Sequence, residues 1–303
     1  MDKIGFGYES LRRIKPDLIY VSHKGFLAGP YESRTALDEV VQMMAGLAYM
    51  TGPPGRPLRA GSSVNDIMGG MFGAIGALAA LNERDRTGAG RHIDSGLFEN
   101  CVLLVAQHML QYAVTGEAAA PMPARLSAWG IYDVFTLSDG SQLFLAVVSD
   151  TQWRAFCRVL GKNDWLTDAR LETNPQRVAA RDWLMPMVKD EIGRRGGQEV
   201  KALATGAGLP WAPITRPEDL FDDPHLAASG GMVPMRLPAG ASSGKVRTPL
   251  LPLAWDGARL PLRSDPPRIG QHTRELLAGA GMSAAEIESL IARGVAAQWT
   301  APW

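Results

Sequence analysis

The chain has 303 residues and equal numbers of basic and acidic side chains, which gives a formal net charge of +0. A neutral chain creates no overall field that would attract nucleic acid or an anionic membrane, so neither is predicted as a partner. Apolar residues make up 46% and charged residues 20% of the sequence, which is typical of a folded globular protein and excludes a disordered chain.

The first elements form half of a parallel α/β unit. Residues 8–14 predict a short helix and residues 18–21 a buried strand. Residues 22–26 are then expected to be a loop at the carboxyl end of this strand, where α/β sheets bind ligands. The sequence shows no second clear parallel strand, so the sheet is expected to take strands from elsewhere or from an N-terminal segment absent from this chain.

A glycine-bearing helix is the most unusual predicted element. Helices are predicted over residues 37–47, 67–82 and 97–114, with an extended piece at 92–94. The second carries Gly69, Gly70, Gly73 and Gly76, each costing roughly 1 kcal/mol relative to alanine. These glycines leave room for a ligand or for a closely packed neighbour, and periodicity does not separate the two. The apolar stretch at 67–81 is predicted to be too short and too rich in glycine to span a bilayer.

The second half begins after a linker predicted at residues 116–123. Residues 132–137 and 142–148, joined by Ser-Asp-Gly-Ser, predict a β-hairpin. Helices are predicted over residues 151–160, 178–194 and 200–205, with Pro186 expected to kink or split the second. From residue 210 the chain is predicted to be extended and interrupted by prolines, until a last helix near residues 283–293 that starts with a capping box.

Asp66 is the main candidate for chemistry. At the start of a helix it could be an N-cap, whose oxygen accepts a hydrogen bond from a free N–H. The helix dipole also favours an ionised carboxylate there, and a positioned carboxylate can be a nucleophile. From the residues alone, both interpretations stay open.

Other chemistries have weaker support. The five histidines show no metal-ligand spacing, and no metal site is predicted. The sequence has neither a serine nucleophile elbow nor a P-loop. Cys101 and Cys157, the two cysteines, suit neither a disulfide framework nor a zinc site and favour a reducing cytoplasm.

Several motifs carry a family resemblance. The segment AGSSVNDIMGGMFGAIGALAALNERDRTGAGRHIDSGLFE, residues 60–99, resembles the central signature of the class III CoA-transferase family, also called CaiB/BaiF. Residues 1–31, 133–157, 221–232 and 268–287 resemble further family segments in the same order. The resemblance therefore covers essentially the whole chain.

The resemblance implies an α/β fold with a Rossmann-like large domain, truncated at its N-terminus, and a small α+β domain. The expected domains are residues 1–118 for the first part of the large domain, 119–224 for the small domain, and 225–303 for a segment returning to the large domain. Family members form interlocked homodimers, so the expected protein partner is a second copy. The glycine-rich lid of formyl-CoA transferase is unlike or absent here, because the corresponding stretch, ARLSAWGIYDVF, holds only Gly130.

The resemblance also implies a function. In transferase members the Asp that matches Asp66 attacks an acyl-CoA thioester and forms aspartyl anhydride and aspartyl-CoA intermediates, without a metal. Backbone N–H groups at the helix start are expected to stabilise the oxyanion. Acyl-CoA and a small carboxylic acid are the expected substrates. CoA is expected to contact Lys3, Lys24, Gly25, Arg34 and Leu37.

Two alternatives accompany this hypothesis. In the racemase branch of the family, the Asp works with a His, and Leu37 occupies that His position, with Asp38 next to it. Without that imidazole, proton exchange at Cα lacks a second base, which favours a transferase over an isomerase. The chain could also be a non-catalytic truncated homologue or subunit.

Overall fold

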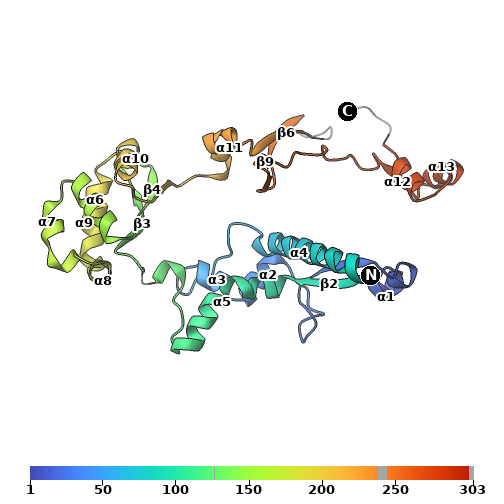
Figure 1. Ribbon diagram of the computed structural model, residues 1–303, viewed down its shortest axis with the longest axis horizontal. Helices are drawn as coiled ribbons and strands as arrows, with labels where there is room; N and C mark the ends of the chain where they lie inside the picture. The colour runs from blue at the N-terminus through green and yellow to red at the C-terminus, as the bar shows by residue number, and fades with distance from the viewer. Residues whose placement is uncertain (126, 238–243, 300–303) are drawn as a thin grey trace. The chain divides into compact units, whose positions relative to one another are not determined.

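The protein has a mixed α/β fold, seen here in a computed structural model that describes residues 1–125, 127–237 and 244–299 (Figure 1). The chain forms two compact units, Met1–Trp129 and Gly130–Trp303. The finer division expected from the sequence, at residues 118 and 224, stays a prediction.

A two-stranded parallel sheet forms the centre of the first unit. Strands β1 (Ile19–Lys24) and β2 (Arg91–Gly96) pair in parallel over their full lengths. The prediction that no second parallel strand exists was therefore wrong. Only a brief extended piece at residues 92–94 was predicted within β2, because its sequence, RHIDSG, lacks the continuous apolar run typical of a buried parallel strand. Strand β1 is also longer than predicted, which places His23 on the strand and not in a loop.

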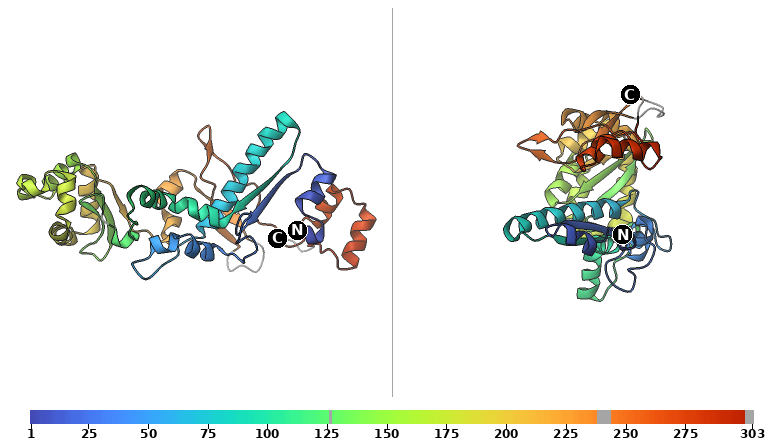
Figure 2. Two further views of the ribbon diagram at one scale, coloured as in Figure 1. Left: turned by 90° about the horizontal axis from the view of Figure 1, so that it is seen from below. Right: turned by 90° about the vertical axis from the view of Figure 1, so that its right-hand side faces the viewer.

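Helix α4 (Val64–Thr87) packs on both strands of this sheet (Figures 1 and 2). Two of its glycines make this close approach geometrically possible. A Cβ added at Gly73 would lie 2.5 Å from Cε1 of His23, and one added at Gly76 would lie 2.8 Å from Cγ2 of Ile93. These two glycines therefore serve helix–sheet packing, the second of the two roles that the sequence left open.

The first unit contains further helices in addition to α4. They are η1 (Asp2–Ile4), α1 (Tyr8–Ile14), α2 (Asp38–Met44), α3 (Leu47–Thr51), α5 (Leu97–Thr115) and η2 (Met122–Ala124). Helices α1 and α5 confirm the sequence prediction. The single helix predicted over residues 37–47 is broken, because Gly46 adopts a left-handed backbone with φ of 85° between α2 and α3.

Helix α4 is also longer than predicted. Its 24 residues make it long and apolar enough to cross a membrane by length and composition alone, so the length argument made from the sequence was wrong. An exposed apolar stripe, formed by Ile67, Met71, Ile75 and Leu78, runs along it. The opposite side of the same helix packs on the β1–β2 sheet. Absence of a membrane partner stays a prediction.

An antiparallel sheet organises the second unit. Strands β3 (Ile131–Thr136) and β4 (Gln142–Val147) form the predicted hairpin, and β5 (Trp211–Pro213) adds to β4. The helices of this part are α6 (Asp150–Val159), α7 (Asn163–Thr167), η3 (Ala169–Leu171), α8 (Asn174–Ala179), α9 (Arg181–Gly193) and α10 (Gly197–Gly206).

The core of this unit lies between the hairpin and helices α6, α9 and α10. Phe135, Leu145, Phe156 and Leu184 are among its almost fully buried side chains. Pro186 was expected to kink or split the helix predicted over residues 178–194; it lies inside α9, and this stretch is divided at Ala180 instead. Pro186 does not end the helix, so the expected split was wrong, and the expected kink stays a prediction.

The last part of the chain is less extended than predicted. It holds η4 (Pro217–Asp222), α11 (Pro224–Ala228), the hairpins β6 (Met232–Arg236) with β7 (Lys245–Pro249) and β8 (Ala254–Trp255) with β9 (Ala258–Arg259), and helices α12 (Thr273–Gly279) and α13 (Ala284–Ala292). The capping box predicted for the last helix is confirmed, because Ser283 and Glu286 cap each other's backbone.

Just before β2, the backbone at Gly90 passes very close to the backbone at Asp17 and Leu18, and a substitution at Gly90 tests this contact. A Cβ there would lie 2.1 Å from the carbonyl oxygen of Leu18 and 2.6 Å from the carbonyl carbon of Asp17. Because these are backbone atoms, we expect Gly90→Ala to lower the free energy of unfolding by about 2 kcal/mol. The matched change Gly70→Ala places a Cβ where nothing lies within 4 Å, so it should raise the free energy of unfolding by up to about 1 kcal/mol. Thermal melting of both variants tests this, and a Gly90→Ala protein as stable as wild type contradicts the crossing.

Candidate active site

A pocket of about 400 Å³ lies where β1 ends and α4 begins. This is the carboxyl end of a parallel strand, the place at which α/β sheets bind ligands. The residues that line it come from both elements, from the loop after β1 and from the start of α5: His23, Lys24, Gly25, Ala36, Asp66, Gly69, Gly70 and Leu97. Of the six residues given a role from the sequence, the pocket therefore brings together Lys24, Gly25 and Asp66.

Asp66 is the third residue of α4, and its side chain is exposed. The N-cap position belongs to Ser63, so the interpretation of Asp66 as an N-cap was wrong. In the part of the chain that the structure describes, no hydrogen bond involves the Asp66 carboxylate. The Asp66 carboxylate therefore stands exposed in the first turn of α4, where it can meet a ligand.

The start of α4 is capped from another helix. Oδ1 of Asp38, in the first turn of α2, accepts hydrogen bonds from the backbone N–H groups of Asn65 at 2.8 Å and of Asp66 at 3.4 Å. The other oxygen, Oδ2, accepts one from the side-chain amide of Gln42 at 2.5 Å and lies 3.8 Å from the Arg59 guanidinium. Asp38 is only 7% exposed. This buried carboxylate therefore fixes the helical turn that carries Asp66.

The same contacts bear on the expectation that backbone N–H groups at this helix start stabilise the oxyanion, which stays a prediction. The N–H groups of Asn65 and Asp66 point to Asp38, and that of Ile67 donates to the Ser63 carbonyl at 3.1 Å. These donors are already used inside the protein. These three N–H groups could stabilise an oxyanion on the attacked carbonyl only by giving up those bonds.

Lys24 brings positive charge to the pocket but is held by two carboxylates. Its ammonium lies 3.3 Å from Asp94 and 3.5 Å from Glu32. Burial acts to lower the pKa of Lys24, but hydrogen bonding and attraction from these carboxylates outweigh it and leave that pKa raised. Lys24 is therefore a firmly charged group, with much of its charge already compensated.

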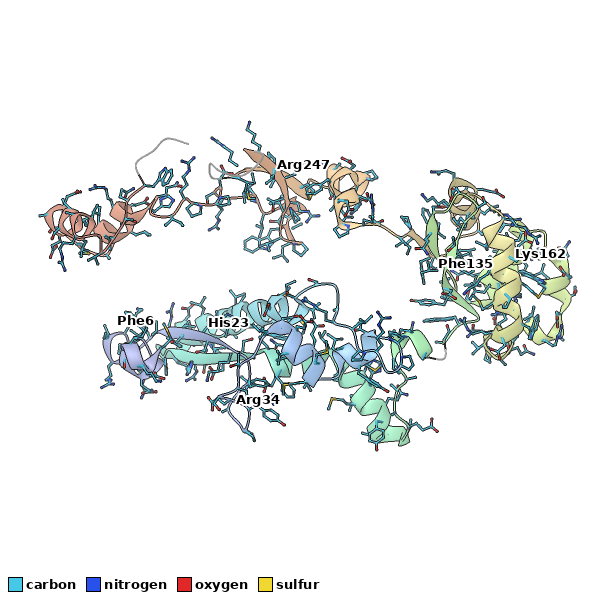
Figure 3. All side chains as sticks on the ribbon, turned by 180° about the vertical axis from the view of Figure 1, so that it is seen from behind. Phe6, His23, Arg34, Phe135, Lys162 and Arg247 are labelled. Carbon is cyan, nitrogen blue, oxygen red and sulfur yellow. The ribbon has the colours of Figure 1, made fainter. Side chains whose placement is uncertain are left out.

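The remaining predicted CoA-binding residues lie outside the pocket lining. Lys3 is an exposed residue of η1, and Leu37 is the exposed N-cap of α2. The Arg34 guanidinium stacks over the ring of Tyr31, 5.1 Å from its centroid, and lies 6.0 Å from that of Phe26. Figure 3 shows Arg34 on the loop after β1 and His23 at the sheet. Gly25 permits a close approach, since a Cβ there would lie 2.2 Å from Cβ of Ala36.

Sequence reasoning missed His23 and gave Asp38 no role. His23 was placed in a loop, whereas strand alternation puts it on the same face as Val21, next to α4. A longer strand assignment would have revealed this orientation. Asp38 could not have been found in this way, because its partners lie 27 and 28 positions away in the sequence.

The opposite face of the sheet carries Ser22, His92 and Asp94, the residue types of a catalytic triad. Nε2 of His92 lies 2.9 Å from Ser22 Oγ and also 3.3 Å from Asp94 Oδ1. A working triad needs one ring nitrogen for the serine and the other for the carboxylate. Because both partners share Nε2, this group cannot activate Ser22 as a nucleophile in that way.

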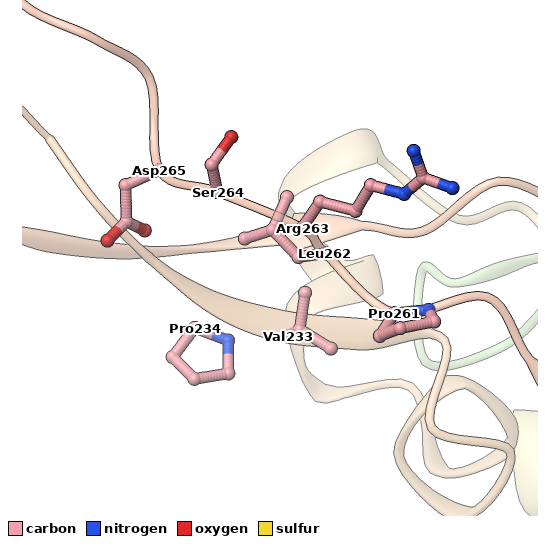
Figure 4. A pocket seen from close by; sticks show the side chains of 7 residues that line it. All are labelled: Val233, Pro234, Pro261, Leu262, Arg263, Ser264 and Asp265. Carbon is pink, nitrogen blue, oxygen red and sulfur yellow. The ribbon is translucent and has the colours of Figure 1, made fainter.

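A second pocket of about 400 Å³ lies in the Gly130–Trp303 unit, lined by Val233, Pro234 and residues 261–265. Figure 4 shows the Arg263 and Asp265 side chains pointing in opposite directions. Asp265 is already engaged, since it accepts a hydrogen bond from the Arg236 backbone N–H at 2.8 Å. This pocket therefore offers no free carboxylate comparable to Asp66. Within the described ranges, no group of three His, Cys, Asp or Glu side chains could hold a metal ion.

Comparison with known proteins identifies the family. The sequence matches CoA-transferase family III over residues 1–273. It is 33% identical over 291 residues to an acyl-CoA transferase of Fusarium pseudograminearum, covering 95% of this chain and 63% of that protein. It is 32% identical over 280 residues to the succinate–glutarate CoA-transferase of Agrobacterium fabrum, covering 91% of this chain and 68% of that protein.

A solved structure agrees with these matches. The crystal structure of a CaiB/BaiF family protein from Brucella suis superposes with a TM-score of 0.79 at 32% identity, covering 92% of this chain and 72% of that one. The chain spans 63% of the length of the Fusarium protein, so it corresponds to less than two thirds of that relative. The match over residues 1–273 and the agreement in fold show that this chain belongs to CoA-transferase family III.

Proposed function

We propose that this protein is a CoA-transferase that moves CoA from an acyl-CoA thioester to a small carboxylic acid, with Asp66 as the nucleophile. The observation that carries the proposal is the exposed Asp66 carboxylate in the first turn of α4, inside a pocket. Family membership supports the reaction type. Relatives named for succinate, glutarate, oxalate and mesaconate support a small dicarboxylic acid as acceptor.

In the proposed first half-reaction, a carboxylate oxygen of Asp66 attacks the thioester carbonyl. The C–S bond breaks, CoA leaves as a thiolate, and a mixed anhydride joins the acyl group to Asp66. The thiolate then attacks the Asp66 carbonyl of this anhydride, releasing the donor acid as a carboxylate and forming an aspartyl-CoA thioester. Each step exchanges one activated acyl group for another, so neither a metal nor a nucleotide has to supply energy.

The second half-reaction runs the same steps in reverse with the new acid. The acceptor carboxylate attacks the aspartyl-CoA thioester, expels the thiolate and forms a second anhydride. The thiolate attacks the acceptor carbonyl of that anhydride, which gives the new acyl-CoA and returns Asp66 as a free carboxylate. No proton is gained or lost over the cycle.

A transfer assay tests the reaction type. Succinyl-CoA and other acyl-CoA donors are incubated with small mono- and dicarboxylic acids, and new thioesters are separated by chromatography. We expect transfer to at least one dicarboxylate. A protein that transfers CoA to none of them is the non-catalytic homologue or subunit considered as the alternative.

An isomerase is the second candidate, because His23 lies in the pocket with Asp66. The racemase branch has a His at the position of Leu37, and its absence here argued against proton exchange. The His23 imidazole could take its place as the second base. Two bases near one Cα could remove and return its proton. Incorporation of solvent deuterium at Cα of a branched acyl-CoA, without transfer of CoA, would favour this function over the first.

We also propose Lys3, Lys24, Arg34, Gly25 and Leu37 as the CoA-binding residues. The position of Lys24 and Gly25 in the pocket lining supports their part of this proposal. Replacing Lys3, Lys24 and Arg34 together by glutamine should weaken CoA binding, more strongly at low salt, because screening is then small. Calorimetric titration of CoA at two ionic strengths measures this. If the triple variant binds CoA as tightly as wild type, these three residues do not bind CoA.

The proposed assembly is an interlocked homodimer with a Rossmann-like large domain. The parallel β1–β2 pair and the exposed apolar stripe of α4 support it, since such a stripe is normally covered. Light scattering should give twice the mass of the chain, and a monomer contradicts the assembly. We propose the cytoplasm as its location. There Cys101 and Cys157 would stay as thiols, because burial raises both pKa values, that of Cys157 to about 12.

A further inference from the structure

The exposed His23 imidazole lies against α4, in the pocket of the proposed nucleophile. His23 lies near the carboxyl end of β1 and lines the pocket that contains Asp66. Its ring rests against the backbone of α4, where Gly73 provides the space. A Cβ on Gly73 would lie 2.5 Å from Cε1 and 3.0 Å from Nε2 of His23. The ring edge could not occupy this position beside any residue with a side chain.

Helix α4 sets the distance between His23 and Asp66. Residues 66, 70 and 73 follow one another at spacings of four and three, so they share one face of the helix. Seven residues of α-helix span about 10 Å along the axis. Between the two ends lies Gly70, which also lines the pocket and has nothing within 4 Å of an added Cβ. The pocket therefore passes over Gly69 and Gly70, which have no side chains, with the Asp66 carboxylate at one end and the His23 imidazole at the other.

His23 is better placed than Lys24 to bind a carboxylate of the ligand. Lys24 already holds Asp94 and Glu32. His23 has an N–H donor in each of its protonation states, and a hydrogen bond to a carboxylate is among the stronger ones in proteins. Asp66 must react with one carboxylate of the acceptor acid, so a second carboxylate on the same acid would reach toward the His23 end.

We propose that His23 binds the distal carboxylate of a dicarboxylic acceptor whose other carboxylate reacts at Asp66. This inference rests on the proposed function and deepens it. The spacing from Asp66 to Gly73 along α4 then selects the length of the acid, since its two carboxylates must reach Asp66 and His23. Dicarboxylates of suitable length are selected over monocarboxylates, which leave the imidazole unpaired.

Kinetics of two variants test the assignment. His23→Leu removes the donor, whereas His23→Gln keeps an N–H group at a similar reach. With glutarate as acceptor, we expect His23→Leu to raise KM about tenfold or more, the effect of losing one hydrogen bond to a charged group. KM for butyrate, which has no distal carboxylate, and KM for the acyl-CoA donor should stay within about twofold. His23→Gln should restore most of the glutarate affinity. His225→Gln, at an exposed histidine in the other unit, is the matched control and should behave as wild type.

The outcomes separate this proposal from the proposed function. An unchanged glutarate KM in His23→Leu, or an equal rise for glutarate and butyrate, overturns the role of His23 while CoA transfer stands. Should the wild-type protein transfer no CoA, calorimetric titration with glutarate alone decides. Binding that wild type shows and His23→Leu lacks supports the role of His23 without the transferase. Absence of binding to wild type overturns it.

Gly73→Ala provides an independent variant should His23→Leu fail to fold. It keeps the imidazole but displaces the ring, because the new Cβ would overlap Cε1. The same rise in the glutarate KM is expected. A Gly73→Ala protein with the wild-type KM for glutarate contradicts the proposal.

Discussion

Replacing Asp66 by asparagine is expected to abolish CoA transfer while the protein keeps its fold. Asparagine has nearly the same shape but cannot attack a thioester as an anion, so the rate should fall by about a thousandfold or more. The melting temperature should stay within a few degrees of wild type. Asp66 is exposed, and Asp38 rather than Asp66 caps the start of α4. Loss of the Asp66 charge therefore removes chemistry without removing a stabilising contact.

A covalent adduct provides the second readout for Asp66. After incubation with acyl-CoA, hydroxylamine or borohydride should trap the intermediate, and mass spectrometry should place it on the peptide that contains Asp66. The matched control is Asp85→Asn, an exposed aspartate near the end of the same helix, which should retain full activity. A fully active Asp66→Asn enzyme, or an adduct on a different peptide, ends the mechanism proposed here.

Local patterns were enough to predict much of the secondary structure. The hairpin β3–β4 and helices α1 and α5 follow from alternation and helical periodicity, which act over neighbouring residues. The capping box at Ser283 is equally local, because its two partners lie three positions apart. The place of Asp66 near a helix start was also predicted from the sequence, because a helix start is a local feature. Its role as nucleophile stays a proposal.

Features that depend on distant residues were missed. Strand β2 is polar by itself, and only its pairing with β1, some seventy positions earlier in the chain, makes it a strand. The glycines of α4 permitted two interpretations until the sheet was seen against Gly73 and Gly76. Likewise, the cap of α4 comes from another helix, so no pattern around residue 66 could distinguish a capping aspartate from a free one.

Asp38 should therefore be the residue on which the geometry of the site depends most. Asp38→Ala leaves the backbone N–H of the buried Asn65 and the amide of the buried Gln42 without their acceptor. An unsatisfied buried donor costs about 1–3 kcal/mol, and two are left here. We expect the free energy of unfolding to fall by about 3 kcal/mol, and CoA transfer to fall with it at temperatures where the protein is still folded.

The neighbouring glutamate supplies a matched control for Asp38. Glu39 is exposed, and its carboxylate lies 3.6 Å from the same Arg59 that Asp38 approaches. Exposed ion pairs contribute little, so Glu39→Ala should change stability by less than about 1 kcal/mol and leave transfer intact. Asp38→Asn should fall between the two. The new amide oxygen at position 38 could still accept the hydrogen bond from the Asn65 N–H. The new amide nitrogen, however, would face the Gln42 amide nitrogen, and both groups are donors. Chemical denaturation of the three variants measures the order, and an Asp38→Ala protein as stable as Glu39→Ala would show that the start of α4 is held by other contacts.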